Sequence, residues 1–234
     1  MKKIAIALLF SLTCTFLAHA QDGKFRFGIQ TSPTFSWLST DNKNINGNGP
    51  NLGFKLGLVG EYDIAENYSF TGGLNFAFNH GGTLKYNNGG TFWPSVTSDT
   101  LSDGVNLKYN IQYVEIPMGM KMRTNEFGLF RFYAELPIFT LGFVSKSTGA
   151  IKAAGDANRE KENIRDEVKG FTVSWGFGVG TEYDLSSTTK LVGGLAFQKS
   201  FVDLTENSGK IGGTTTDDSK ANMSALTLKI GVIF

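Results

Sequence analysis

The sequence predicts an all-β fold, an eight-stranded antiparallel up-and-down transmembrane β-barrel. Apolar and polar residues alternate in eight separate segments, the pattern of strands whose two faces meet different surroundings. The connections between these segments are alternately short and long. After residue 20, no apolar run is long enough to cross a bilayer as a helix. Together, these observations favour strands as the membrane-crossing elements.

The N-terminus has the pattern of a secretory leader. Two lysines precede an apolar run that ends at Leu17, and Ala18-His19-Ala20 is a small-x-small cleavage site. The run is shorter than the ~18 residues expected of a spanning helix. We therefore expect a cleaved signal peptide at 1–20 and one barrel domain at 21–234. Cleavage would remove Cys14, the only cysteine, so neither disulfides nor thiolate sites are expected in the mature chain.

The eight segments are joined in a way that sets their direction. Tight turns require the strands that they join to be antiparallel, so short connections gather at one end and long ones at the other. The predicted strands are 25–37, 52–62, 68–79, 109–123, 130–143, 171–183, 191–201 and 226–234. Short turns are expected at 63–67, 124–128 and 185–189, and long polar loops at 38–51, 80–106, 145–170 and 203–221.

Two of the predicted strands are irregular. In 109–123 the apolar residues change phase after Tyr113, and a β-bulge near Tyr113 is the predicted cause. In 130–143, Phe132 lies on one face and Phe139 on the other.

The residues of the polar face indicate which side meets lipid. That face is rich in Gly, Ser, Thr and Ala with scattered ions, which suits a narrow barrel interior better than a water-facing coat. The aromatic apolar face then faces lipid. From Phe25 to Trp37 the rise is ~28 Å at ~3.3 Å per residue and a tilt of ~45°, which matches a hydrocarbon core. The alternative is a periplasmic lipocalin-like barrel, which turns its apolar face inward.

The ends of the predicted strands carry aromatic residues, and the chain itself ends on one. We expect interfacial aromatics at Trp37, Tyr62, Tyr68 and Tyr183. The terminal stripe consists of Leu228, Ile230, Val232 and Phe234. It resembles the C-terminal signal read by the barrel-assembly machinery of Gram-negative outer membranes. We therefore expect an integral outer-membrane protein with extracellular loops and both termini periplasmic.

Ionic side chains on the polar face need partners, because an unpaired buried charge is costly. Glu115 and Glu135 are expected to lie near Lys121 and Arg131 on adjacent strands. Such a salt-bridged plug leaves no open pore, and a gated proton or solute path is the alternative interpretation. The predicted lumen network consists of Arg26, Lys55, Glu61, Glu115, Lys121, Arg131, Glu135 and Glu182, with Arg123 on the same face.

Two segments, YVEIPMGMKMR (113–123) and FYAELPIFTLGF (132–143), resemble the PorT-like outer-membrane β-barrel family. Its members typically show an aromatic-x-Glu-Ile-Pro segment that leads into a strand, then a Phe-Tyr-x-Glu strand. The Gly-rich run that usually follows is here Leu136-Pro137-Ile138-Phe139. The resemblance implies an eight-stranded barrel. Many members have no assigned activity, and one branch takes part in a protein secretion system.

Few residues are candidates for chemistry. His80 is the only histidine beyond the leader; we expect it to be a polar rim residue, so no catalytic residue is predicted. Phe92-Trp93-Pro94, in a long loop, would fold over the barrel mouth, enter the membrane interface or contact a partner. The aspartate pairs 99/103 and 217/218 offer at most weak cation binding, because their spacing fits no calcium loop. No cofactor or metal site is expected.

These observations predict a non-enzymatic structural or interaction protein. The expected partners are outer-membrane lipids and lipopolysaccharide, the barrel-assembly machinery and an extracellular or secretion-system protein. A net charge of +1 argues against nucleic acid. The alternatives are a porin-like small-solute channel, a secretion-system component, a lipid-modifying barrel enzyme that uses His80, and the lipocalin-like binder.

Overall fold

The computed structural model describes residues 24–153, 158–206, 209–212 and 215–234, so the expected leader lies outside the described residues. One 3-10 helix, η2 (Arg165–Glu167), is present, and no helix in the described ranges is long and apolar enough to cross a membrane. The strands are β1 (Phe25–Thr40), β2 (Ile45–Ala65), β3 (Tyr68–Tyr86), β4 (Gly90–Thr91), β5 (Val105–Arg123), β6 (Phe130–Lys152), β7 (Arg159–Asn163), β8 (Phe171–Asp184), β9 (Lys190–Ser200), β10 (Lys210–Ile211), β11 (Thr215–Thr216) and β12 (Ala221–Ile233).

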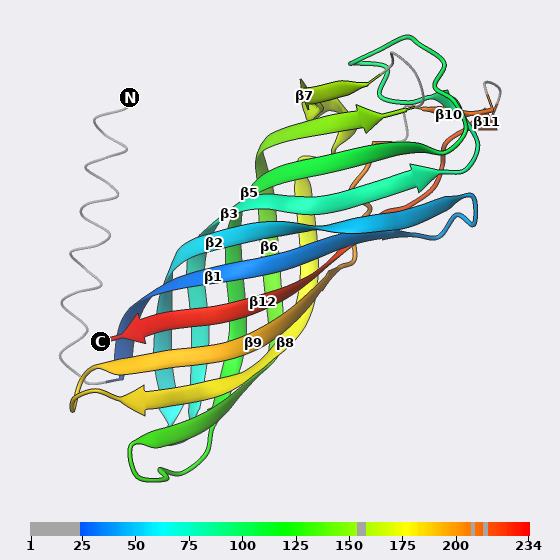
Figure 1. Ribbon diagram of the computed structural model, residues 1–234. Coiled ribbons are helices and arrows are strands. Elements are labelled where there is room, and N and C mark those ends of the chain that lie inside the picture. Colours follow the sequence, from blue (N-terminus) through cyan, green and yellow to red (C-terminus); the bar gives the residue numbers. More distant parts are fainter. Residues whose placement is uncertain (1–23, 154–157, 207–208, 213–214) are drawn as a thin grey trace, which may run out of the picture.

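Eight long strands close into a barrel in the order β1-β2-β3-β5-β6-β8-β9-β12 (Figure 1). All neighbours in this ring are antiparallel, and β12 returns to β1 through pairs that run from Gly28↔Ile233 to Thr40↔Ala221. The predicted eight-stranded up-and-down barrel is confirmed. Closure gives the backbone N–H and C=O groups of every strand in the ring hydrogen-bond partners, which lipid cannot provide.

Large apolar side chains cover the outside of the barrel. Leu56, Phe76 and Phe177 are 47%, 47% and 44% exposed. Small and ionic residues of the same strands, such as Ser69 and Glu182, are buried inside. The inverted, lipocalin-like arrangement is therefore wrong for this chain, because the barrel interior is too narrow for the aromatic face.

Many of the residues expected to form long polar loops are instead strand. β1 and β2 continue to a short turn between Thr40 and Ile45, and β3, β5 and β6 extend far beyond their expected ends. The wall thus rises well past the lipid-facing band, at the end opposite the C-terminus (Figure 1). The inward side chains of this extension are apolar and pack together. This mouth core includes Leu38, Ile45, Leu84, Tyr86, Phe92, Trp93, Leu107, Tyr109, Ile111, Tyr113, Ile151 and Leu204.

The phase change in β5 has a different cause from the one predicted. Alternate residues from Val105 to Tyr113 are buried, and Glu115 and Lys121 continue the same inward phase, so β5 has no bulge near Tyr113. The register shifts at this level lie in the neighbouring strands, after Ala77 in β3 and at 145 in β6. A register shift is thus present near Tyr113, between Gln112 and Tyr113 against β6, but its extra residue lies in β6. The phase change in β5 has another cause, because the surroundings of the strand change instead. Apolar residues face outward at lipid level and inward in the extension.

The irregularity of β6 is a local insertion. One extra residue at Leu136-Pro137 shifts the register against both β5 and β8. Phe132 before the shift and Phe139 after it are therefore both exposed on the outer surface. The insertion keeps the phenylalanines on both sides of it on the lipid side of the strand.

The predicted interfacial aromatics and terminal stripe lie on the outer surface. Trp37, Tyr62 and Tyr68 are exposed, and Tyr183 is half-buried against Phe130, with ring centroids 4.8 Å apart. In the terminal stripe Leu228, Ile230 and Phe234 are exposed and Val232 is half-buried.

Candidate functional site

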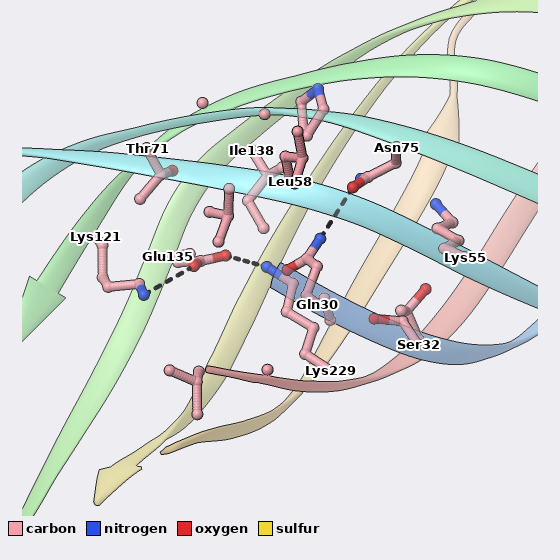
Figure 2. Close-up of a pocket in the computed structure, with 18 of the residues that line it drawn as sticks. Gln30, Ser32, Lys55, Leu58, Thr71, Asn75, Lys121, Glu135, Ile138 and Lys229 are labelled. Carbon is pink, nitrogen blue, oxygen red and sulfur yellow. Dashed lines mark hydrogen bonds and ion pairs between the residues drawn. The ribbon is translucent and has the colours of Figure 1, made fainter. Parts of the chain in front are cut away.

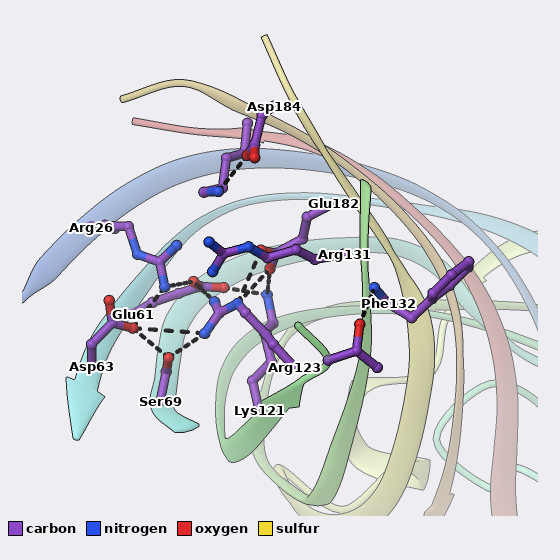
Figure 3. Close-up of polar contacts among 12 residues, drawn as sticks. Arg26, Glu61, Asp63, Ser69, Lys121, Arg123, Arg131, Phe132, Glu182 and Asp184 are labelled. Carbon is purple, nitrogen blue, oxygen red and sulfur yellow. Dashed lines mark hydrogen bonds and ion pairs between the residues drawn. The ribbon is translucent and has the colours of Figure 1, made fainter. Parts of the chain in front are cut away.

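The lumen near the short-turn end contains a buried cluster of four charges, Glu61 from β2, Lys121 and Arg123 from β5, and Glu182 from β8 (Figure 3). Lys121 contacts Glu61, and its Nζ lies 3.2 Å from Glu182 Oε1. Arg123 also contacts Glu61, and its Nε donates to Glu182 Oε2 at 2.9 Å. All four side chains are at most 2% exposed. Each charge has at least two opposite partners, which offsets the cost of burial.

The cluster continues to the rim through Arg26 and Asp63. Arg26 Nη2 lies 2.6 Å from Asp63 Oδ1 and 3.3 Å from Glu61 Oε2. Ser69 donates to Asp63 at 2.5 Å and also contacts Arg123. The hydroxyl therefore links the rim pair to the buried four.

A second layer lies above the cluster, toward the middle of the barrel (Figure 2). Glu135 of β6 contacts Lys229 of β12, and its Oε1 lies 3.6 Å from Lys121 Nζ. Gln30 donates to Asn75 Oδ1 at 3.2 Å. The Glu135–Lys229 and Gln30–Asn75 contacts join strands that are not neighbours in the ring.

A third group completes the polar lumen. Lys55 Nζ donates to Glu115 Oε2 and to Gln198 Oε1, both at 2.8 Å. Gln198 in turn donates to Thr140 Oγ1 at 2.6 Å. The lysine, which is almost completely buried, thus bridges β2 to β5 and β9.

Opposite charges balance in these layers. Five cations face five anions, so the formal charge is 5 − 5 = 0, and paired charges of this kind tolerate burial. A cavity of about 60 Å³ lies among these layers, lined in part by Gln30, Lys55 and Glu135. The ten residues are Arg26, Lys55, Lys121, Arg123, Lys229, Glu61, Asp63, Glu115, Glu135 and Glu182.

The structure brings seven of the eight predicted lumen charges into this network. The exception is Arg131, which contacts Glu126 beside the β5–β6 turn because it lies near the end of β6. Glu115 pairs with Lys55, whereas we expected Lys121 or Arg131. Two members were not predicted. Lys229 alternates with the terminal apolar stripe, so its position in the strand could have predicted a side chain in the lumen. Asp63 was expected in a turn.

His80 is not at a polar rim. It is completely buried inside the barrel, edge-on to Tyr113 with ring centroids 6.3 Å apart. Neither ring nitrogen has a hydrogen-bond partner among the described residues. The rim prediction is wrong because the wall continues above His80, and His80 takes part in no hydrogen-bonded catalytic arrangement in the described part of the chain.

The Phe92-Trp93 segment fills the barrel mouth, the first of the three alternatives. Both side chains are at most 3% exposed, and Trp93 Nε1 donates to the Tyr109 hydroxyl at 3.1 Å. The Phe92 ring lies 4.2 Å from that of Tyr86. A Cβ on Gly149 would lie 2.5 Å from Trp93, so the missing side chain there makes room for the indole.

The aspartates of the long connections are used in local contacts. Hydrogen bonds from Thr97 and then Arg159 hold the pKa of Asp99 below its usual range. Asp103 accepts from the Gly89 amide at 2.6 Å, and Asp217 accepts from the Ser219 amide at 3.1 Å. Within the described ranges, no group of three His, Cys, Asp or Glu residues is placed to hold a metal ion.

The family follows from the sequence match together with this fold. Residues 19–206 match the family model described as outer membrane protein beta-barrel domain. The match covers most of the chain, and the chain therefore belongs to this family. It is a transmembrane β-barrel protein of the outer membrane.

Comparison with individual proteins gives only distant likenesses. No curated protein matches. Among solved structures, the chain is similar to Neisserial surface protein A (12% identity, TM-score 0.43, 88% of this chain and 95% of that chain). It is also similar to a major outer membrane protein from Thermus thermophilus (12%, 0.45, 90% and 98%) and to OprG from Pseudomonas aeruginosa (11%, 0.42, 89% and 95%). At these scores, the function of none of these proteins transfers to this chain.

Proposed function

We propose that the protein is a non-enzymatic outer-membrane barrel that acts as a rigid support for the surface formed by its extended wall and long connections. The observation that carries this proposal is that two separate groups of side chains fill the lumen. Paired charges fill its lower part and the aromatic mouth core fills its upper part. A barrel without a continuous channel offers its outer surface and its loops for function.

The proposed orientation places the long connections outside the cell and both termini in the periplasm. The partners that we propose are the lipids and lipopolysaccharide around the barrel, the barrel-assembly machinery during biogenesis, and an extracellular protein. The segments YVEIPMGMKMR and FYAELPIFTLGF support membership of the PorT-like family. Because one branch of this family takes part in a protein secretion system, a secretion-system component is the partner to test first.

A small-solute channel is the second candidate. The observation that favours it is the cavity of about 60 Å³ between the charge layers. A path would require the charges on both sides of this cavity to separate and the Trp93 segment to leave the mouth. The enzyme alternative has weaker support, because the buried His80 has no hydrogen-bonded carboxylate or serine among the described residues.

Conductance in planar lipid bilayers distinguishes these candidates. The purified protein is expected to give no discrete current steps, because both fillings block the lumen. The comparison is a combined variant, Trp93→Ala with Lys121→Met and Glu61→Gln. It removes part of the aromatic mouth core and part of the charge cluster. Steps in the wild type at low voltage would contradict the closed barrel and favour the channel.

A further inference from the structure

The lipid-facing surface ends at a definite level on four adjacent strands. The last outward apolar residues are Leu52 on β2, Phe78 on β3, Val114 on β5 and Phe143 on β6. Three of them are 62%, 42% and 45% exposed and Val114 is half-buried. Beyond this level the outward positions are polar or small, so the boundary between the lipid-facing and polar surfaces crosses this wall.

Above the boundary, the outer face of β3, β5 and β6 carries four lysines and no carboxylate. Alternation with the buried residues of the mouth core defines which positions point outward. The lysines give this surface a formal charge of +4, although the whole chain carries only +1. The outward positions are Thr83, Lys85, Asn106, Lys108, Asn110, Gln112, Lys146, Thr148, Ala150 and Lys152.

The strand register brings the lysines together. Asn106 pairs with Lys85 on one side and with Lys152 on the other. Lys108 is the next outward residue of β5, so it lies diagonal to both lysines, at a distance of ~7–8 Å. Lys146 is opposite Gln112, closer to the lipid. We call these four lysines the basic face.

The basic face is free of internal neutralisation. None of its lysines forms an ion pair with a described carboxylate. Asp103 and Glu160 border a hollow beside Lys152, at the upper rim. The excess of positive charge is therefore greatest on the side of the lipid, around Lys108 and Lys146.

We propose that the basic face binds the phosphate groups of the phosphorylated glycolipid of the outer leaflet, lipopolysaccharide. This inference rests on the proposed orientation. The face points sideways from the wall, so a soluble partner that approaches from the medium meets the tips of the long connections first. Molecules anchored in the same leaflet stand directly beside it, and anionic head groups complement its charge.

The height of the lysines fits a tall head group better than a phospholipid. Lys146 comes three residues after Phe143 and Lys152 nine residues after it. With ~3.3 Å per residue and a tilt of ~45°, these positions lie ~7 Å and ~21 Å above the last apolar row. A phospholipid phosphate reaches only the lower end of this range, whereas phosphorylated sugars extend along it.

The test uses the full-length mature protein in detergent and four lipid probes. Binding of bisphosphorylated lipid A, dephosphorylated lipid A, phosphatidylglycerol and phosphatidylcholine is measured by native mass spectrometry. The basic-face variant combines Lys85→Gln, Lys108→Gln, Lys146→Gln and Lys152→Gln. A matched control combines Lys43→Gln, Lys199→Gln, Lys210→Gln and Lys220→Gln, four exposed lysines elsewhere on the barrel.

The wild type and the control should prefer bisphosphorylated lipid A over the other three probes, and added salt should weaken this preference. The basic-face variant should lose at least about tenfold in affinity for it. Equal loss in both variants, no loss in either, or equal binding of phosphatidylglycerol would overturn the inference. Dependence on the phosphates separates specific binding from adsorption to the apolar surface.

Two further measurements separate this inference from the proposed function. Conductance is recorded for the same preparations. If the basic-face variant is folded and closed but binds bisphosphorylated lipid A like the wild type, only the inference about the basic face is refuted, and the proposed function stands. Labelling of Asp218→Cys in intact cells by a membrane-impermeant maleimide tests the orientation, with Ser187→Cys in a short turn as the control. Labelling of Ser187→Cys alone would overturn both the orientation and the inference.

Discussion

Lys121 holds the centre of the lumen network at the scale of single residues. Its ammonium group contacts Glu61 and lies 3.2 Å from Glu182 and 3.6 Å from Glu135, and it is also 4.5 Å from the centre of the Tyr133 ring. Three strands therefore supply carboxylates to one cation. Removing it leaves like charges close together without water to screen them.

Lys121→Met should lower the free energy of unfolding by about 3–5 kcal/mol, because a buried pair loses one partner. Urea unfolding in phospholipid vesicles measures the change. Arg131→Met is the matched control, since its partner Glu126 is exposed and the expected change is below about 1 kcal/mol. Equal effects of the two substitutions would show that the central network contributes no more than the rim.

Gly149 is the residue on which the filling of the mouth depends. Gly149→Val should displace the Trp93 indole and cost about 1–3 kcal/mol through overpacking. Fluorescence in a Trp37→Phe, Trp175→Phe background reports only Trp93, and its emission should shift to the red with greater quenching by iodide. Gly193→Val is the control, because a Cβ at that position meets open space. An unshifted spectrum would contradict the role of Gly149.

At the scale of elements, β12 combines closure of the barrel with the terminal stripe. The backbone of Phe234 exchanges two hydrogen bonds with Phe27, at 2.6 and 3.3 Å, whereas its side chain is 57% exposed. The ring therefore contributes little to the folded barrel. This separation of backbone and side chain allows the proposed assembly signal to be tested without breaking the strand.

Phe234→Ala should leave folding in detergent unchanged and reduce the amount assembled in cells several-fold. The measurement is the ratio of folded to unfolded protein in outer-membrane fractions. Phe201→Ala removes an equally exposed aromatic that directly follows β9 and should leave this ratio unchanged. If both variants assemble like wild type, the C-terminal ring is not a recognition element.

At the scale of the whole molecule, closure is the property with the clearest consequence. Each of the eight strands is hydrogen-bonded on both sides, and the charges inside cross-link strands that are not neighbours. Detergent at room temperature is not expected to open such a ring. The unboiled protein should therefore migrate differently from the boiled protein on a detergent gel. Identical mobility before and after boiling would contradict a closed barrel.

Sequence periodicity determined the strands at lipid level and the face of each that meets lipid. The physical reason is local, since a period of two with aromatic residues on one side and small or ionic ones on the other has one arrangement in a narrow barrel. The same periodicity could have predicted that Lys229 points into the lumen, because this residue alternates with the terminal apolar stripe.

Only the tertiary structure decided what the same pattern means at different heights. Tyr113 and Phe139 look alike in their alternating segments, yet one fills the mouth and the other faces lipid. Alternation carries no information about distance from the membrane, so it could not show that the wall continues past His80. Nor could it pair Lys55 with Glu115, because which charges meet inside depends on the stagger of strands that are not neighbours in the ring.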